Sequence, residues 1–202
     1  MQTNTHRISF LAKWPKKVVL GIVVLLWSAL AGFRLLDAWQ NALIIPALLA
    51  AQAGLMAWLL ITRRRQAGEA RWQHKVGAWI SALLPLALRI HHETLVGQII
   101  TVLGLLIALW AMWTLGRSFG VAPADRGLVR EGPYRWLRHP MYLGELVALS
   151  GAVLGNLTPW NSLVLLILLI TLLLRIQWEE TAITGYAIYI DQVRWRMIPF
   201  LY

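Results

Sequence analysis

The sequence predicts an all-α fold, a polytopic transmembrane helical bundle of about six spans. Hydrophobic residues make up 58% of the 202 positions and charged residues only 14%, which is too apolar for a soluble domain of this length. Apolar runs close to the length that crosses a hydrocarbon core of about 30 Å alternate with charged segments. The cations also gather in alternate loops, as they do in multi-span membrane proteins.

Six apolar runs account for the predicted spans. They cover residues 18–33, 42–61, 76–90, 95–115, 141–154 and 160–174. The third, fifth and sixth are short for a complete crossing, so one of them could be re-entrant, and five spans are the alternative.

The net charge of +10 could indicate nucleic-acid binding, but the positions of the cations argue for membrane topology instead. With six spans, all of the 19 Lys and Arg residues except Arg34 and Arg89 fall on one side of the membrane. Excess cations stay in the cytosol during insertion, so both termini are expected there. The absence of cysteine excludes disulfides, thiolate metal sites and cysteine nucleophiles, and no metal site is predicted.

The character of the chain changes after residue 115. Residues 1–115 are expected to form four scaffold helices, and residues 116–202 a cytosolic loop, a helical hairpin and a tail. Residues 116–140 combine five Arg with several Gly and Pro, which indicates a structured loop. Asn156, Thr158 and Pro159 mark a tight turn, so the fifth and sixth helices should form a hairpin that brings the loop and the tail together.

Two segments on the predicted cytosolic side contain candidate functional residues. Residues 132–145 deliver Arg, His and Tyr side chains to the exposed start of a helix, where free N–H groups suit a carboxylate or phosphate. Residues 175–180 place a guanidinium and two carboxylates at one membrane interface, and ionisable groups at membrane depth are usually functional. Taken one at a time, these residues could equally be topological anchors and a surface ion pair.

Together the two segments resemble the isoprenylcysteine carboxyl methyltransferases and the related phospholipid N-methyltransferases. The shared positions are Gly132 to Arg135, Arg138 to Pro140, Tyr142, Gly144, Arg175, Glu179, Glu180, Gly185, Tyr186, Tyr189, Ile198 and Pro199. The resemblance covers roughly the last 90 residues. Only four residues separate Glu180 from Gly185, fewer than in most of the family, so the substrate entrance is expected to differ.

The resemblance implies S-adenosylmethionine as the methyl donor and assigns roles to nine residues. The expected cofactor-binding residues are Tyr134, Arg138, His139, Tyr142, Glu145, Trp178 and Glu180, and the expected catalytic residues are Arg175 and Glu179. A carboxylate acceptor would need only a guanidinium such as Arg175 to orient it. An amine acceptor would need a carboxylate or His to take its proton.

The acceptor is expected to be a lipophilic or prenylated small molecule, or a membrane lipid. Carboxyl O-methylation of an isoprenylcysteine-type substrate is the first expectation, and phospholipid N-methylation is an alternative. A sterol-type membrane reductase that uses a nicotinamide cofactor and a non-catalytic scaffold are further alternatives. We expect a multi-pass protein of a bacterial or archaeal inner membrane; the oligomeric state is left open.

The cation distribution generates a topological prediction. The C-terminus is expected in the cytosol, because the loops rich in Lys and Arg remain there. A reporter that functions in the cytosol should therefore be active when it is fused after Tyr202. Activity of a C-terminal reporter that functions only outside the cytosol would contradict the proposed orientation.

Overall fold

The computed structural model of the protein describes residues 16–67, 71–91 and 94–201. Over these residues the regular structure is helical, with only isolated β-bridges and no strand. The elements are α1 (Lys16–Asn41), α2 (Ile44–Thr62), α3 (Trp72–Leu83), η2 (Leu84–Ala87), α4 (Leu95–Leu115), η3 (Gly116–Ser118), η4 (Gly132–Arg135), α5 (Pro140–Leu154), α6 (Pro159–Ala182) and α7 (Tyr186–Gln192). The predicted all-α membrane bundle is confirmed.

Four helical segments are long and apolar enough to cross a membrane. They are Val18–Asn41, Ile44–Thr62, Leu95–Ser118 and Pro159–Ala182, and Pro140–Leu154 is a shorter apolar helix. The first and last are longer than the predicted runs, because both continue past their apolar stretches into polar residues. Arg7 and Lys13, which contribute to the predicted charge asymmetry, lie outside the described residues.

The third predicted span is a broken helix. The 12 residues of α3 reach only about 18 Å, and a 3-10 turn that contains Pro85 follows. The backbone beyond it is paired by side chains of the α5–α6 turn and α6. Asn161 accepts from the N–H of Arg89 (3.0 Å) and donates to its carbonyl (2.9 Å), and Asn156 accepts from the N–H of His91 (2.8 Å). Such pairing is what allows non-helical backbone at membrane depth.

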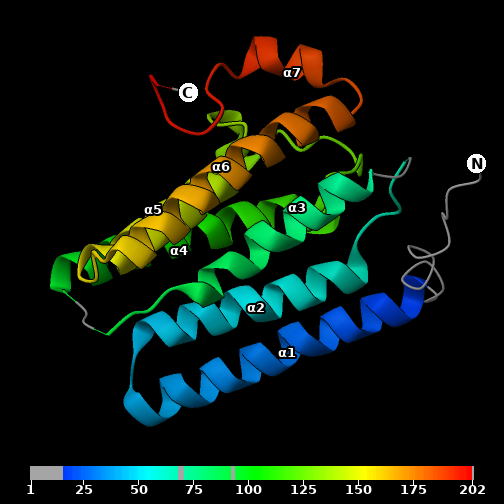
Figure 1. The fold of residues 1–202 in the computed structure, drawn as a ribbon. Coiled ribbons are helices and arrows are strands. Elements are labelled where there is room, and N and C mark those ends of the chain that lie inside the picture. The colour runs from blue at the N-terminus through cyan, green and yellow to red at the C-terminus, as the bar shows by residue number, and fades with distance from the viewer. Residues whose placement is uncertain (1–15, 68–70, 92–93, 202) are drawn as a thin grey trace, which may run out of the picture.

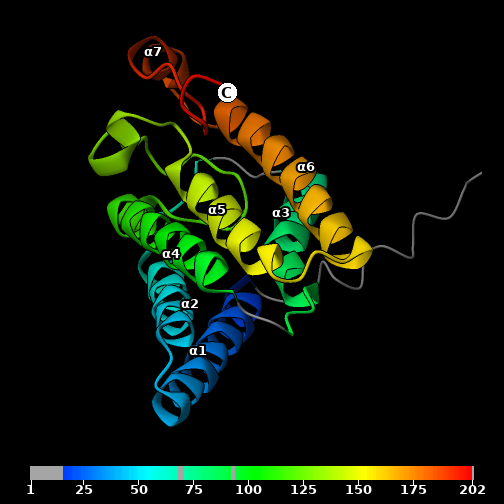
Figure 2. The same ribbon diagram turned by 90° about the vertical axis from the view of Figure 1, so that its left-hand side faces the viewer.

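The helices form layers that run from one edge of the bundle to the other (Figures 1 and 2). The α1–α2 hairpin lies at one edge, α4 and α5 lie in the middle, and α7 lies at the opposite edge beside the end of the chain. Helix α3 packs along α6, whereas α2 packs against α4. The turn after α5 returns the chain through α6 to the side where α5 begins, as the predicted hairpin requires.

Glycines allow α4 and α5 to approach each other closely. A Cβ at Gly104 would lie 2.2 Å from the backbone N of Ala148, and one at Gly144 would lie 2.5 Å from the N of Ala108. Thr101 Oγ1 also donates to the carbonyl of Ala148 at 3.2 Å. Small residues at such contacts are typical of membrane helices, which associate through close packing.

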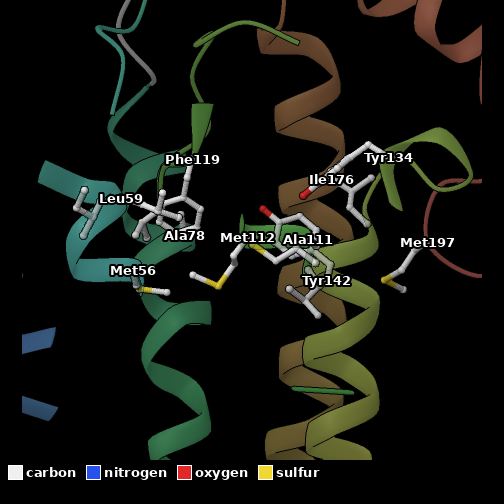
Figure 3. Packing of buried hydrophobic residues seen from close by; sticks show 14 of the residues in the cluster. Met56, Leu59, Ala78, Ala111, Met112, Phe119, Tyr134, Tyr142, Ile176 and Met197 are labelled. Carbon is white, nitrogen blue, oxygen red and sulfur yellow. The ribbon is translucent and has the colours of Figure 1, made fainter. Parts of the chain in front are cut away.

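A hydrophobic core at one end of the bundle joins the helices to the loop and the tail (Figure 3). Leu59 of α2, Met112 of α4 and Ile176 of α6 are fully buried there. Tyr134 from the loop and Met197 from the tail complete the same cluster. The loop and the tail that contain the predicted site residues therefore pack against this hydrophobic core.

The glycine contact between α4 and α5 predicts a large packing effect. Gly104→Val should lower stability by about 1–3 kcal/mol or prevent folding, because backbone atoms of α5 occupy the space. Gly32→Val on α1, where a Cβ would meet nothing within 4 Å, is the matched control. Thermal unfolding in detergent measures both, and equal melting temperatures for the two variants would contradict this account of the interface.

Candidate functional site

The site is built where the start of α5 meets the tail. Pro140 occupies the first turn of α5, a position that suits its fixed φ and missing N–H. The N–H groups of Arg138 and His139 are thereby left outside the helix, and they donate to the carbonyls of Trp195 (2.9 Å) and Arg196 (2.7 Å). This short parallel pairing holds the tail against the segment that precedes α5.

The Glu180 carboxylate, near the end of α6, joins three side chains. Arg138 Nη1 lies 3.0 Å from Glu180 Oε1, and Arg196 Nη2 lies 3.1 Å from Oε2. His139 Nε2 lies 3.4 Å from Glu180 Oε1. The side chains of Glu180, Arg138 and His139 are all at least nine-tenths buried. One buried carboxylate therefore links α5, α6 and the tail, and charge-assisted hydrogen bonds of this kind are strong.

Glu179 and Arg175 lie on either side of Tyr142. The Tyr142 hydroxyl donates to Glu179, and His139 Nδ1 lies 3.8 Å from the same carboxylate. The Arg175 guanidinium sits over the Tyr142 ring at 4.8 Å from its centroid. It also donates to Ser81 Oγ at 2.7 Å and to the carbonyl of Val121 at 3.0 Å. Arg175 is thus buried inside the bundle and does not end a membrane helix at the surface.

A pocket lies between the 118–129 loop, the start of α5 and α7. Tyr134, Tyr186 and Tyr189 line it. Burial raises the pKa of Tyr134 and of Tyr186, and it raises the pKa of Tyr189 to about 12, so all three remain neutral phenols at physiological pH. The space is about 80 Å³, so a nucleoside-sized ligand requires the loop to move outward.

A second and larger cavity lies among the membrane helices. Its volume is about 550 Å³, within the range of small-molecule sites. It extends between α2 and α4 on one side and α3 on the other, beneath α5. Met141 lines both cavities, and Glu145, one turn further along α5, lines only the second. Met141, in the first turn of α5, is therefore the lining residue that the two spaces share.

The structure brings most of the predicted site residues together and separates the rest. The loop-side pocket is lined by Tyr134, Arg138, His139, Tyr142 and Glu179. Glu180 does not line this pocket, but its carboxylate contacts the side chains of Arg138 and His139. Glu145 and Arg175 line the membrane cavity instead. Trp178, predicted to contact the cofactor, stacks on His74 at 4.6 Å in the α3–α6 interface. That position gives Trp178 a packing role.

Arg126 is a pocket residue that the sequence analysis treated only as a topological cation. It is 6% exposed and lines the loop-side pocket. Its neighbours Asp125 and Gly127 are typical turn residues, and nothing in the local sequence distinguishes a buried guanidinium from an exposed one. Ser81, which fixes Arg175, was missed for the same reason: an isolated serine in an apolar run carries no signal.

The segment that contains this site is similar to the membrane methyltransferases. Residues 92–189 match the family model described as phospholipid methyltransferase, and that segment contains all of the residues shared with the predicted motifs up to Tyr189. The match confirms the predicted relationship to the membrane methyltransferases, and it supports methyl transfer as the activity. No curated protein matches the chain significantly.

The Glu180 cluster generates a prediction about the tail. Glu180→Gln should weaken the docking of the tail by about 1.5–3 kcal/mol, because an amide makes weaker hydrogen bonds to the two guanidinium groups than a carboxylate does. Trypsin cleavage after the half-buried Arg196 should therefore become about tenfold to a hundredfold faster. Glu131→Gln, which neutralises an exposed carboxylate of the loop, is the control. Equal cleavage rates in the two variants would mean that Glu180 does not hold the tail.

Proposed function

We propose that the protein transfers a methyl group from S-adenosylmethionine to the amine headgroup of a lipid that enters from the bilayer. The observation that carries this proposal is that Met141 lines two cavities, one bounded by polar loops and one within the membrane. A water-soluble donor and a lipophilic acceptor can reach the same point from opposite sides. The matching family, described as phospholipid methyltransferase, supports this acceptor class.

The residues of the loop-side pocket fit the proposed donor. When bound, S-adenosylmethionine supplies a methyl group on a positively charged sulfur that is already a good leaving group. Glu179 offers a carboxylate to the cationic part of such a ligand, and the neutral phenol rings of Tyr134 and Tyr189 offer π faces to a cation or to adenine. The chain mainly positions the partners, which is where most of the rate of such a displacement arises.

The charge around Arg175 favours an amine acceptor over a carboxylate. The Arg175 guanidinium interacts electrostatically with both Glu145 and Glu179, although it forms no ion pair with either among the described residues. Its terminal nitrogens already donate to Ser81 and Val121. A carboxylate headgroup beside Glu145 would place two negative charges together in a region of low dielectric, whereas an ammonium headgroup would be attracted to Glu145.

Glu145 is placed to act on such an acceptor. It lines the membrane cavity one turn below Met141, and among the described residues its carboxylate makes no hydrogen bond or ion pair within 4 Å. An amine must lose its proton before its lone pair can attack, and a carboxylate beside the headgroup can take that proton. Glu145 would therefore hold the ammonium form and then serve as the base.

Arg175 supports carboxyl methylation of an isoprenylcysteine-type substrate as the second candidate. Its Nε is buried and has no hydrogen-bond partner among the described residues. A carboxylate acceptor could occupy that donor and would need no base. The two candidates make opposite predictions for Glu145, because a base is required only for the amine.

The acceptor is tested with the detergent-purified protein, S-adenosylmethionine and two classes of lipid, analysed by mass spectrometry. The wild type should methylate an aminophospholipid in preference to a prenylated cysteine carboxylate. Glu145→Gln should reduce methylation of the amine by about a hundredfold or more, in line with the loss of a general base. It should leave the melting temperature and the affinity for S-adenosylhomocysteine nearly unchanged.

Glu131→Gln serves again as the control carboxylate, and it should retain full activity. Preferential methylation of the prenylated carboxylate, with Glu145→Gln active, would favour the second candidate. Failure of the wild type to bind S-adenosylhomocysteine at all would favour the reductase or the scaffold.

A further inference from the structure

The Arg126 guanidinium is held in a defined position on the wall of the loop-side pocket. Nη2 donates to Gln66 Oε1 at 2.9 Å, and Nη1 donates to the carbonyl of Ala122 at 3.3 Å. A Cβ at Gly120 would lie 2.4 Å from Nη1, so the absence of a side chain there allows the guanidinium to lie flat against the backbone. The hydrogen bonds to Gln66 and Ala122 and the close contact with Gly120 therefore fix the position of the Arg126 guanidinium.

Arg126 has no anionic partner of its own among the described residues. Of the other cationic side chains that line the pocket, Arg138 contacts Glu180 at 3.0 Å and His139 lies between Glu180 and Glu179. No carboxylate of the described residues lies within 4 Å of Arg126, and its Nε is buried without a hydrogen-bond partner. Burial lowers the pKa of Arg126, Arg63 adds to the shift, and Glu179 opposes it from a longer distance.

A purely structural role explains these facts poorly. Arg126 does join the α2–α3 connection to the 118–129 loop through Gln66 and Ala122. A neutral amide or amine could make the same two hydrogen bonds without the cost of burying a full charge. A buried guanidinium that faces a pocket and lacks a counter-charge is instead suited to an anion that arrives with a ligand.

We propose that Arg126 binds the α-carboxylate of the methyl donor's amino-acid end. This inference rests on the proposed function. Arg138 is the obvious candidate from the sequence, but its Nη1 donates to Glu180 and its Nη2 to the carbonyl of Arg194 (3.3 Å), so it is occupied in holding the tail. Glu179, which lines the same pocket, is left for the ammonium and the charged sulfur.

This arrangement gives the pocket a selectivity. Arg126 and Glu179 line the same pocket without forming an ion pair with each other, which matches a ligand that carries both an anion and a cation. A nucleoside without the carboxylate would leave Arg126 uncompensated. The loop from residue 118 to residue 129 would then close less favourably, because its buried cation contributes to the ligand contact.

The test pairs a residue substitution with a ligand truncation. The ligands are S-adenosylhomocysteine and its decarboxylated analogue, which retains the amine, titrated calorimetrically into detergent-purified full-length protein. Arg126→Gln should weaken binding of S-adenosylhomocysteine about tenfold to a hundredfold. It should change the affinity for the decarboxylated analogue by less than about threefold, because the missing interaction is already absent there.

Two control variants separate binding from folding. Gln66→Ala removes the loop contact of Arg126 but keeps its charge, and Arg135→Gln removes an exposed cation that lies outside the pocket lining. Arg135→Gln should keep the wild-type preference for the carboxylate-bearing ligand, and Gln66→Ala should reduce that preference only in part, because the charge of Arg126 remains. Equal weakening of both ligands by Arg126→Gln, or no weakening of either, would overturn the inference while leaving the proposed function intact. A wild type that binds neither ligand would overturn the proposed function and this inference with it.

Discussion

The buried carboxylate of Glu180 is the interaction on which the rest of the site depends. It compensates Arg138 and Arg196 and contacts His139, so it couples the start of α5, the end of α6 and the tail. Charges this deep are tolerated only when they are paired and hydrogen-bonded. Because Glu180 engages Arg138 and His139 from behind, the neighbouring residues Tyr142 and Glu179 are free to face the pocket. A cluster that stabilises the fold thereby also shapes the site.

The cavity among the membrane helices depends on a different feature, the break in the chain after α3. A cavity requires helices that do not pack against one another, yet every backbone polar group within the membrane must be paired. The break after α3 meets both conditions, since Asn156 and Asn161 pair the freed backbone of Arg89 and His91. Helix α3 can then lean on α6 and leave space against α2 and α4. Arg175, whose guanidinium lies 4.8 Å from the Tyr142 ring centroid, lines that space together with Glu145.

Sequence patterns predicted what depends on local composition and motif spacing. The limits of α4 and the start of α5 follow from an apolar run and from Pro140. The predicted hairpin and the family resemblance together predicted that Arg138, His139, Glu179 and Glu180 converge. The predicted end of the sixth span at residue 174 was wrong, because charges that suggest a solvated tail are paired inside the bundle, so α6 continues to Ala182. The burial of Arg126 and the two cavities could not be predicted, since both depend on how distant segments pack.

Hydrogen exchange with and without S-adenosylhomocysteine tests the central claim, that the loop-side pocket is the cofactor site, most directly. Slower exchange is expected in the 118–129 loop and in residues 134–139 and 186–197 when the ligand is present, because these segments contact the bound ligand and the docked tail is stabilised. Exchange in the α1–α2 hairpin, which lies at the opposite edge of the bundle, should not change. Binding accompanied by protection confined to the membrane helices, with the loop and tail unaffected, would contradict the account.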